Sequence, residues 1–203
     1  MSIASISVWI PKGGCGKSTV AVNIAAAFSR RGATVSLVDL DPQAGSLIFA
    51  SIAKRLNQAL PFTIGRSVNP GANLVIYDHG PTMIEAVPGD VVVMPTLLDA
   101  ASYSVFVPGT QRVQIWNKPL VEVPNRVNTS RQAHRKVLER FHPNSPFLRD
   151  RSIYNEAYSR GQSIYDCALS GRLQAIAEME AVTNRVEATL KTLFLCAAPS
   201  RAA

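Results

Sequence analysis

The strongest candidate for chemistry in this sequence is the run of residues 12–19, Lys-Gly-Gly-Cys-Gly-Lys-Ser-Thr, which lies between an apolar run and a helical pattern. Glycines let successive backbone N–H groups curl around a phosphate, and a helix that begins near Lys17 adds the positive end of its dipole. The ammonium of Lys17 would reach the β- and γ-phosphate oxygens, and the hydroxyl of Ser18 would ligate Mg²⁺. The sequence therefore predicts a Mg²⁺-dependent nucleotide site formed by Gly13, Gly14, Cys15, Gly16, Lys17, Ser18 and Thr19.

Acidic residues at two later apolar runs could complete such a site. Asp41 follows one of these runs and Asp78 ends another. The carboxyl ends of parallel strands converge where such sheets bind ligands, and a cation that bridges two phosphates needs a hydroxyl and carboxylate-held waters. We therefore predict Asp41 and Asp78, with Ser18, as the metal site, and ordinary loop acids are the alternative. Asp39 is either a site residue or a residue that orients the loop, and the sequence leaves both interpretations open.

The elements that must position these residues alternate between strands and helices. Apolar, β-branched runs predict strands at 3–10, 34–40, 74–78, 90–94 and 120–123. Helical spacing predicts helices at 18–31, 47–60, 100–116, 130–141, 152–160 and about 171–195, with a break at Pro108-Gly109 in the third. This alternation predicts an α/β fold with a doubly wound, mostly parallel sheet, helices on both faces, and one domain over residues 1–203.

The bulk composition favours a folded protein in a reducing compartment. Apolar residues make up 47% and charged residues 17% of the 203-residue chain, a composition that can bury a core. The three cysteines lie far apart, which argues against a disulfide framework, a Cys-rich zinc site and an iron–sulfur protein. The first residues show no export signal, and no apolar run reaches about 18 residues. We expect a cytoplasmic protein.

The glycine loop departs from the ordinary G-x-x-x-x-G-K-[ST] pattern, because a proline occupies the place of the first glycine and Lys12 precedes the paired glycines. With Lys12 included, the loop resembles the deviant Walker A loop of the ParA/MinD family. Residues 38–43, Val-Asp-Leu-Asp-Pro-Gln, are similar to the switch I motif of that family, and residues 74–78, Leu-Val-Ile-Tyr-Asp, are similar to its Walker B strand. Weaker matches cover 91–96 and, loosely, 151–164.

The resemblance implies an ATP-hydrolysing homodimer that sandwiches two ATP molecules. In that family the early lysine, here Lys12, crosses to the phosphates of the other subunit, so Lys12, Lys17 and Asp41 are the implied catalytic residues. Asp41 would orient the attacking water, and Asp78 would hold a Mg²⁺-bound water. The sequence departs from the family at His79, which either senses the γ-phosphate or faces solvent. We expect slow hydrolysis, and this departure bears on its rate more than on binding.

Net charge gives a second indication of function. The chain carries +7, and residues 112–172 hold eleven Lys/Arg against five Asp/Glu, a difference of +6. A basic face of this kind suits a polyanionic partner, although a solvated surface with surplus arginine is the alternative. Candidates for DNA contact are Arg131, Arg135, Lys136, Arg140, Arg149, Arg151 and Arg160, and Asn125 and Arg126 are expected in the nucleotide site near the adenine.

Within the family, the chain resembles the small ParA type of plasmid partition over about residues 3–170. In that type the ATP dimer binds nonspecific DNA, and a centromere-binding adaptor protein stimulates hydrolysis and release. The resemblance therefore implies a second copy of the chain, nonspecific DNA and an adaptor as partners, and a nucleoid-associated location. The loop begins so early that we expect no helix-turn-helix domain before it.

Three alternatives stay open. A MinD-like membrane-associated positioning ATPase needs a basic amphipathic C-terminal helix, but residues 182–196 hold only Arg185 and Lys191 as cations. A packed core helix is therefore favoured there, and no membrane partner is expected. A small-molecule enzyme of the same superfamily is disfavoured by the surplus of arginine. A protein that binds ATP and barely turns it over is compatible with the sequence.

Overall fold

The computed structural model describes residues 3–197, which fold around a six-stranded sheet. The strands are β1 (Ala4–Val8), β2 (Val35–Asp39), β3 (Thr63–Gly65), β4 (Leu74–Asp78), β5 (Val91–Thr96) and β6 (Leu120–Pro124). They are ordered β3-β2-β4-β1-β5-β6, and every neighbouring pair is parallel. The predicted parallel sheet is confirmed. The edge strand β3 escaped prediction because three residues are too few to show a periodic pattern.

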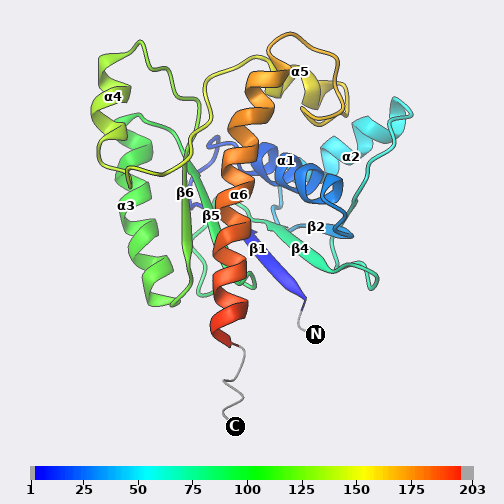
Figure 1. The fold of residues 1–203 in the computed structure, drawn as a ribbon, viewed down its shortest axis with the longest axis horizontal. Coiled ribbons are helices and arrows are strands. Elements are labelled where there is room, and N and C mark those ends of the chain that lie inside the picture. Colours follow the sequence, from blue (N-terminus) through cyan, green and yellow to red (C-terminus); the bar gives the residue numbers. More distant parts are fainter. Residues whose placement is uncertain (1–2, 198–203) are drawn as a thin grey trace.

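Six helices connect and cover the described strands. They are α1 (Lys17–Arg30), α2 (Gly45–Arg55), α3 (Ala100–Ile115), α4 (Gln132–Leu138), α5 (Ile153–Ser159) and α6 (Arg172–Ala197). Helices α1, α2 and α6 pack together on one face of the sheet, whereas α3 packs on β5 from the other face. Figure 1 shows α6 running the height of the molecule, with α3 and α4 beside the β6 end of the sheet.

The strand order creates a crevice beside β1. From β1 the chain moves toward one edge of the sheet to form β2. After β4, which lies between β2 and β1, it passes β1 to form β5 toward the other edge. Open parallel sheets bind ligands at the carboxyl ends of the strands where such connections diverge. The register places Asp78 between Val8 of β1 and Asp39 of β2. Two of the acids named from the sequence therefore end neighbouring strands at this edge.

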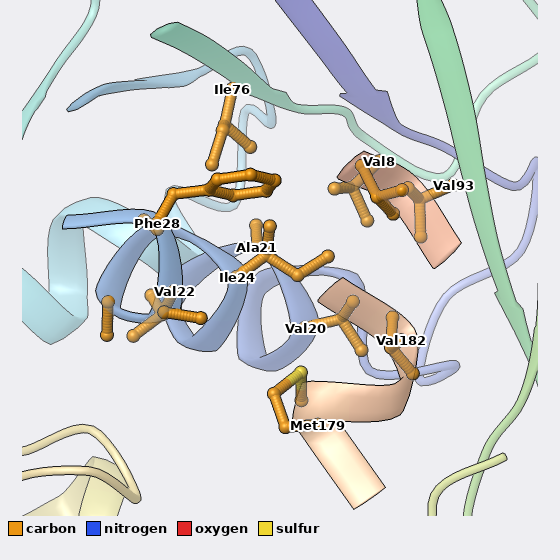
Figure 2. Packing of buried hydrophobic residues seen from close by; sticks show 14 of the residues in the cluster. Val8, Val20, Ala21, Val22, Ile24, Phe28, Ile76, Val93, Met179 and Val182 are labelled. Atoms are coloured by element: carbon orange, nitrogen blue, oxygen red, sulfur yellow. The ribbon is translucent and has the colours of Figure 1, made fainter. Parts of the chain in front are cut away.

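Helix α1 is buried on nearly all sides, which fixes the position of the loop before it. Phe28 of α1 lies against Ile76 of the sheet, and Val20 lies near Met179 and Val182 of α6 (Figure 2). A helix between a sheet and a second helix needs apolar residues around its whole circumference. The alanines of α1 suit this place, because they combine high helix propensity with small volume.

Helix α3 runs through Pro108 without interruption, so the predicted break is wrong. A proline removes one backbone hydrogen bond and favours a kink, but here the flanking turns are held by buried Phe106 and Val113. Gly109 faces β5, where a Cβ would lie 3.4 Å from the end of the Met94 side chain. Packing against the sheet overrides the local preference for a break.

Helix α6 buries its apolar face in the core beside α1, as the sequence favoured. The buried positions follow helical spacing at Ala175, Met179, Val182, Val186 and Leu190. Arg31, after the end of α1, donates to Glu180, Asn184 and Glu187 of α6. The two helices are thus joined by apolar contact along their length and by charge at one end.

Loops cover the second face of the sheet over β1 and β2. The N–H of Gly89 donates to Ser7 Oγ, and the N–H of Asn69 donates to Ser36 Oγ, both at 3.0 Å. A Cβ at Gly89 would lie 2.3 Å from the backbone nitrogen of Ser7, so glycine alone permits this approach. The prediction of helices on both faces therefore holds at β5, while segments 66–73 and 79–90 replace a helix farther along the sheet.

Candidate nucleotide-binding site

The glycine loop between β1 and α1 uses backbone conformations that favour glycine. Gly14 and Gly16 have φ values of 75° and 87°, which are unfavourable for residues with a Cβ. Asn125, which follows β6, donates from Nδ2 to the carbonyl of Cys15 at 2.8 Å. A Cβ at Gly16 would lie 2.4 Å from that nitrogen. Asn125, predicted near the adenine, therefore also anchors the loop.

The two lysines of the loop lie in different surroundings. Lys17 is buried, and its Nζ donates to the carbonyl of Lys12 at 2.8 Å. Burial lowers the pKa of Lys17, while the negative charges of Asp78 and Asp41 oppose this shift. Lys12 is half-buried. Lys17 thus lies inside the site, whereas part of Lys12 reaches solvent.

Asp78 has one satisfied and one unsatisfied oxygen. Its Oδ2 accepts a hydrogen bond from Ser46 Oγ at 2.7 Å, whereas its buried Oδ1 has no hydrogen-bond partner within residues 3–197. Burial raises the pKa of Asp78 to about 6, although the hydroxyls of Ser46 and Ser18 have the opposite, smaller effect on this pKa. Ser46 was not identified from the sequence. Its one signal is a hydroxyl in the first turn of the helix after Asp41.

Asp39 orients the loop that carries Asp41, which resolves the two interpretations left open by the sequence. It is fully buried. Its Oδ1 accepts from the N–H of Asp41 at 3.0 Å, and its Oδ2 accepts from the N–H of Leu47 in α2 at 2.9 Å. Asp41 is also buried, and its Oδ1 accepts from the N–H of Gln43 at 2.8 Å.

His79 is buried, so the interpretation that it faces solvent is wrong. Its side chain is 5% exposed, and its Nε2 lies 3.0 Å from Ser7 Oγ in β1. Burial, with a smaller effect of Lys17, lowers the pKa of His79 to about 4. The imidazole is therefore neutral near pH 7, and it joins the start of the 79–90 segment to the central strand.

Two tryptophans hold the 79–90 segment by hydrogen bonds to its backbone carbonyls. Trp9 Nε1 donates to the carbonyl of Thr82 at 3.1 Å, and Trp116 Nε1 donates to that of Glu85 at 2.5 Å. The two rings are tilted against each other with centroids 4.8 Å apart. Trp9 lies just before the glycine loop, so the loop and the segment share one support. The sequence gives no local signal for the contact between Trp9 and Thr82, because the two residues are 73 positions apart.

A cavity of about 400 Å³ brings together the predicted nucleotide residues other than Cys15, which is fully buried. This volume is within the usual range for small-ligand pockets. Its lining includes Gly13, Gly14, Gly16, Lys17, Ser18, Thr19, Asp41, Asn125, Arg126, Arg149, Arg151, Tyr154 and Tyr158. Tyr158 of α5 also donates to the carbonyl of Gly45 at 2.5 Å. Helix α5 was not assigned to the site from the sequence, yet it forms one wall.

The basic residues predicted to contact DNA fall into separate places. Arg149 and Arg151, here called the rim pair, line the nucleotide cavity and share the carboxylate of Glu178. A second group lies within α4 or next to its ends, and no residue of α4 is buried. This group, here called the α4 cluster, consists of Arg131, Arg135, Lys136 and Arg140. Arg160 is exposed at the end of α5.

The residues present fit a nucleoside triphosphate and Mg²⁺. The unsatisfied Oδ1 of Asp78 is an oxygen suited to a hydrated divalent cation. Space at the Ser18 hydroxyl is kept open by Gly45, because a Cβ there would lie 2.4 Å from Ser18 Oγ. Lys17 and the left-handed glycines provide the phosphate-binding side of the same cavity.

A parallel sheet whose first strand leads through a glycine loop into a buried helix, with acids at the ends of neighbouring strands, defines a P-loop nucleotide-binding protein. Residues 6–164 match the family model described as the CobQ/CobB/MinD/ParA nucleotide binding domain. The chain belongs to this family, and the resemblance to ParA/MinD proteins is confirmed.

Two relatives bear the name maintenance of carboxysome distribution protein A. The one from Gloeobacter kilaueensis is 32% identical over 148 residues, which cover 69% of this chain and 64% of the relative. The one from Halothiobacillus neapolitanus is 24% identical over 202 residues, which cover 86% of this chain and 92% of the relative. The match thus spans less than two thirds of the first relative and most of the second.

Solved structures of the family share the fold. MinD from Aquifex aeolicus has a TM-score of 0.70 at 14% identity, covering 91% of this chain and 97% of its own. An ATP complex of Cyanothece McdA has a TM-score of 0.69 at 14% identity, covering 92% and 96%. A Borrelia burgdorferi plasmid partition protein has a TM-score of 0.65 at 15% identity, covering 93% and 99%. Within residues 3–197, no helix has the length and apolar character needed to cross a membrane.

Proposed function

We propose that the chain is an ATPase that dimerises around ATP, binds nonspecific DNA as the ATP dimer, and is released when ATP is hydrolysed. The contrast between the loop lysines carries this proposal. Lys17 is buried and lines the cavity, whereas Lys12 is half-buried and is not among the residues that line it. A lysine so placed suits the phosphates of a second copy, where it would stabilise developing charge in trans.

Within one subunit, the loop N–H groups and Lys17 bind the phosphates, and Ser18 and Asp78 hold Mg²⁺. The bound cation supplies charge neutralisation at the phosphates. Asp41 is the proposed catalytic residue. The N–H of Gln43 holds its Oδ1, which leaves the other oxygen to accept a hydrogen bond from the attacking water. Asn125 and Arg126 also line the cavity, and they are the proposed contacts of the adenine.

The α4 cluster is the proposed DNA-contacting surface. Arg131, Arg135, Lys136 and Arg140 are all exposed. Each phosphate that a cation neutralises contributes roughly 0.9 to the slope of log affinity against log salt, so joining two subunits doubles the electrostatic contribution. DNA binding should therefore be weak for the monomer and much tighter for the dimer that forms with ATP.

The proposed cargo is a plasmid, recognised through a centromere-binding adaptor that stimulates hydrolysis on the nucleoid in the cytoplasm. The plasmid partition protein among the structural neighbours supports this cargo. A protein body such as a carboxysome is a second candidate, favoured by the names of the two relatives. A membrane-bound role is less well supported, because α6 uses its apolar face within the core.

Mass measurement by light scattering after size exclusion tests the dimer. We expect the wild type to double in mass with ATP and Mg²⁺ and to stay monomeric with ADP. Lys12→Ala should bind ATP and remain monomeric, and Lys17→Ala should not bind it. Lys54→Ala, which removes an exposed lysine from α2, is the matched control and should dimerise. A normal ATP dimer from Lys12→Ala would contradict the role of Lys12 in trans.

A further inference from the structure

Arg66 connects the end of edge strand β3 to the loop that carries Asp41. Its Nη1 donates to the carbonyl oxygens of Asp39 and Asp41, both at 2.9 Å. The same nitrogen lies 3.6 Å from Oδ1 of Asp39, whose side chain is fully buried. Pairing of β3 with β2 brings Arg66 to this place, since Gly65 lies opposite Val38. One side chain therefore holds the backbone at both acids.

The backbone of Asp41 is held from two directions. Its N–H donates to Oδ1 of Asp39 at 3.0 Å, and its C=O accepts from Arg66. The other carboxylate oxygen of Asp39 accepts from the N–H of Leu47, which ties this arrangement to α2. Because peptide groups are planar, fixing those on either side of a residue restricts its φ and ψ and thus the direction of its side chain.

We propose that Arg66 is a positioning residue for ATP hydrolysis, whose guanidinium fixes the backbone of Asp41 so that the carboxylate meets the attacking water in the required orientation. This inference rests on the proposed role of Asp41 in hydrolysis. A displacement of about 1 Å can cost on the order of 100-fold in rate. Arg66 lies outside the described lining of the nucleotide cavity, so its loss should affect turnover more than ATP affinity.

The surroundings of Arg66 separate this role from a purely structural one. Its side chain is 51% exposed, so its removal leaves no buried cavity and the protein should still fold. All three contacts use a single nitrogen, Nη1. A lysine ammonium carries three donors on one nitrogen and can therefore replace this group, whereas alanine cannot.

The test compares Arg66→Ala and Arg66→Lys with Asp41→Ala. Arg55→Ala is the matched control, because it removes an exposed arginine from the end of α2. Steady-state hydrolysis gives kcat and KM, and titration with a fluorescent ATP analogue gives affinity. We expect Arg66→Ala to lower kcat about 10-fold or more while affinity changes less than about twofold. Arg66→Lys should recover most of kcat, and Arg55→Ala should match the wild type.

The outcomes separate this inference from the proposed function. Full hydrolysis by Arg66→Ala beside an inactive Asp41→Ala would overturn the inference and leave the proposed function intact. Equal loss in Arg66→Ala and Arg66→Lys, together with weakened ATP binding, would show a structural role and also overturn it. Full hydrolysis by Asp41→Ala would remove the catalytic assignment, and the role of Arg66 with it.

Discussion

The α4 cluster and the rim pair are both positively charged and lie within one stretch of the chain, yet their surroundings differ. Arg151 donates from Nη2 and Nε to Glu178 at 2.7 and 3.1 Å, and Arg149 uses the same carboxylate. Residues of the α4 cluster contact a carbonyl or an aromatic ring instead: Arg135 donates to Thr129, and the guanidinium of Arg140 lies 5.3 Å from the ring centre of Tyr103. A distant acid on α6, Glu178, offsets one of the two charges of the rim pair, while the α4 cluster keeps its charge available to a polyanion.

Loss of nucleotide binding should abolish ATP-dependent DNA binding by the α4 cluster without changing the charge of the cluster. This is the largest effect that we expect. Lys17→Ala should weaken ATP binding by roughly 100-fold or more, because it deletes a charge-assisted contact with the phosphates. DNA binding in the presence of ATP should then fall to the level seen with ADP. Fluorescence titration with labelled nucleotide and labelled duplex measures both. DNA binding equal to that of the wild type would show that the α4 cluster acts without the nucleotide switch.

Neutralising part of the α4 cluster should weaken DNA binding and leave ATP hydrolysis unchanged. For Arg131→Gln with Lys136→Gln we expect about 10-fold weaker binding of the ATP form, and a salt slope reduced by roughly 0.9 for each DNA phosphate that a subunit no longer neutralises. The matched control is Lys54→Gln with Arg55→Gln on α2, which removes the same charge from an exposed helix end. Equal effects of the two double variants would mean that net charge, rather than this surface, determines binding.

Breaking the rim pair should affect stability rather than DNA. Arg151→Ala leaves Glu178 without its bidentate partner, and the two side chains are 24% and 16% exposed. We expect the free energy of unfolding to fall by about 1 kcal/mol. Arg149→Ala should cost less, since Arg149 is 50% exposed and its guanidinium lies 3.8 Å from the carboxylate. Urea unfolding measures both. Because Arg151 also lines the nucleotide cavity, ATP affinity is measured beside DNA affinity, and a large loss of DNA affinity in Arg151→Ala with ATP affinity unchanged would place the rim pair in the DNA surface.

Local patterns predicted the parts of the site that depend on neighbouring residues. The glycine loop, Asp41 and Asp78 lie at or just after strand ends, where alternation and glycine spacing are readable. The structure places the loop and Asp41 around one cavity, and it buries Asp78 against Ser46 at the end of β4. The roles of Asp39 and Asn125 depend on contacts between separate elements. Asn125 reaches Cys15 from 110 positions away.

Misses have the same physical origin. The break expected at Pro108 ignored packing of α3 on the sheet. Neither interpretation of His79, sensing of the γ-phosphate or exposure to solvent, included its contact with Ser7, because nothing near His79 in the sequence indicates that hydroxyl. Charge counting grouped Arg151 with α4, because its neutralising partner Glu178 lies in a later helix. Long-range contacts, both the packing of a helix on the sheet and the pairing of polar groups, are therefore what the sequence alone leaves undetermined.

Binding to nonspecific duplex DNA with ATP, with ADP and without nucleotide, measured across a salt series, tests the central claim most directly. The account predicts tight, salt-sensitive binding with ATP and Mg²⁺, and weak binding in the other two states. Absence of binding in every state, or equal binding in all three, would contradict an ATP-switched DNA-binding dimer.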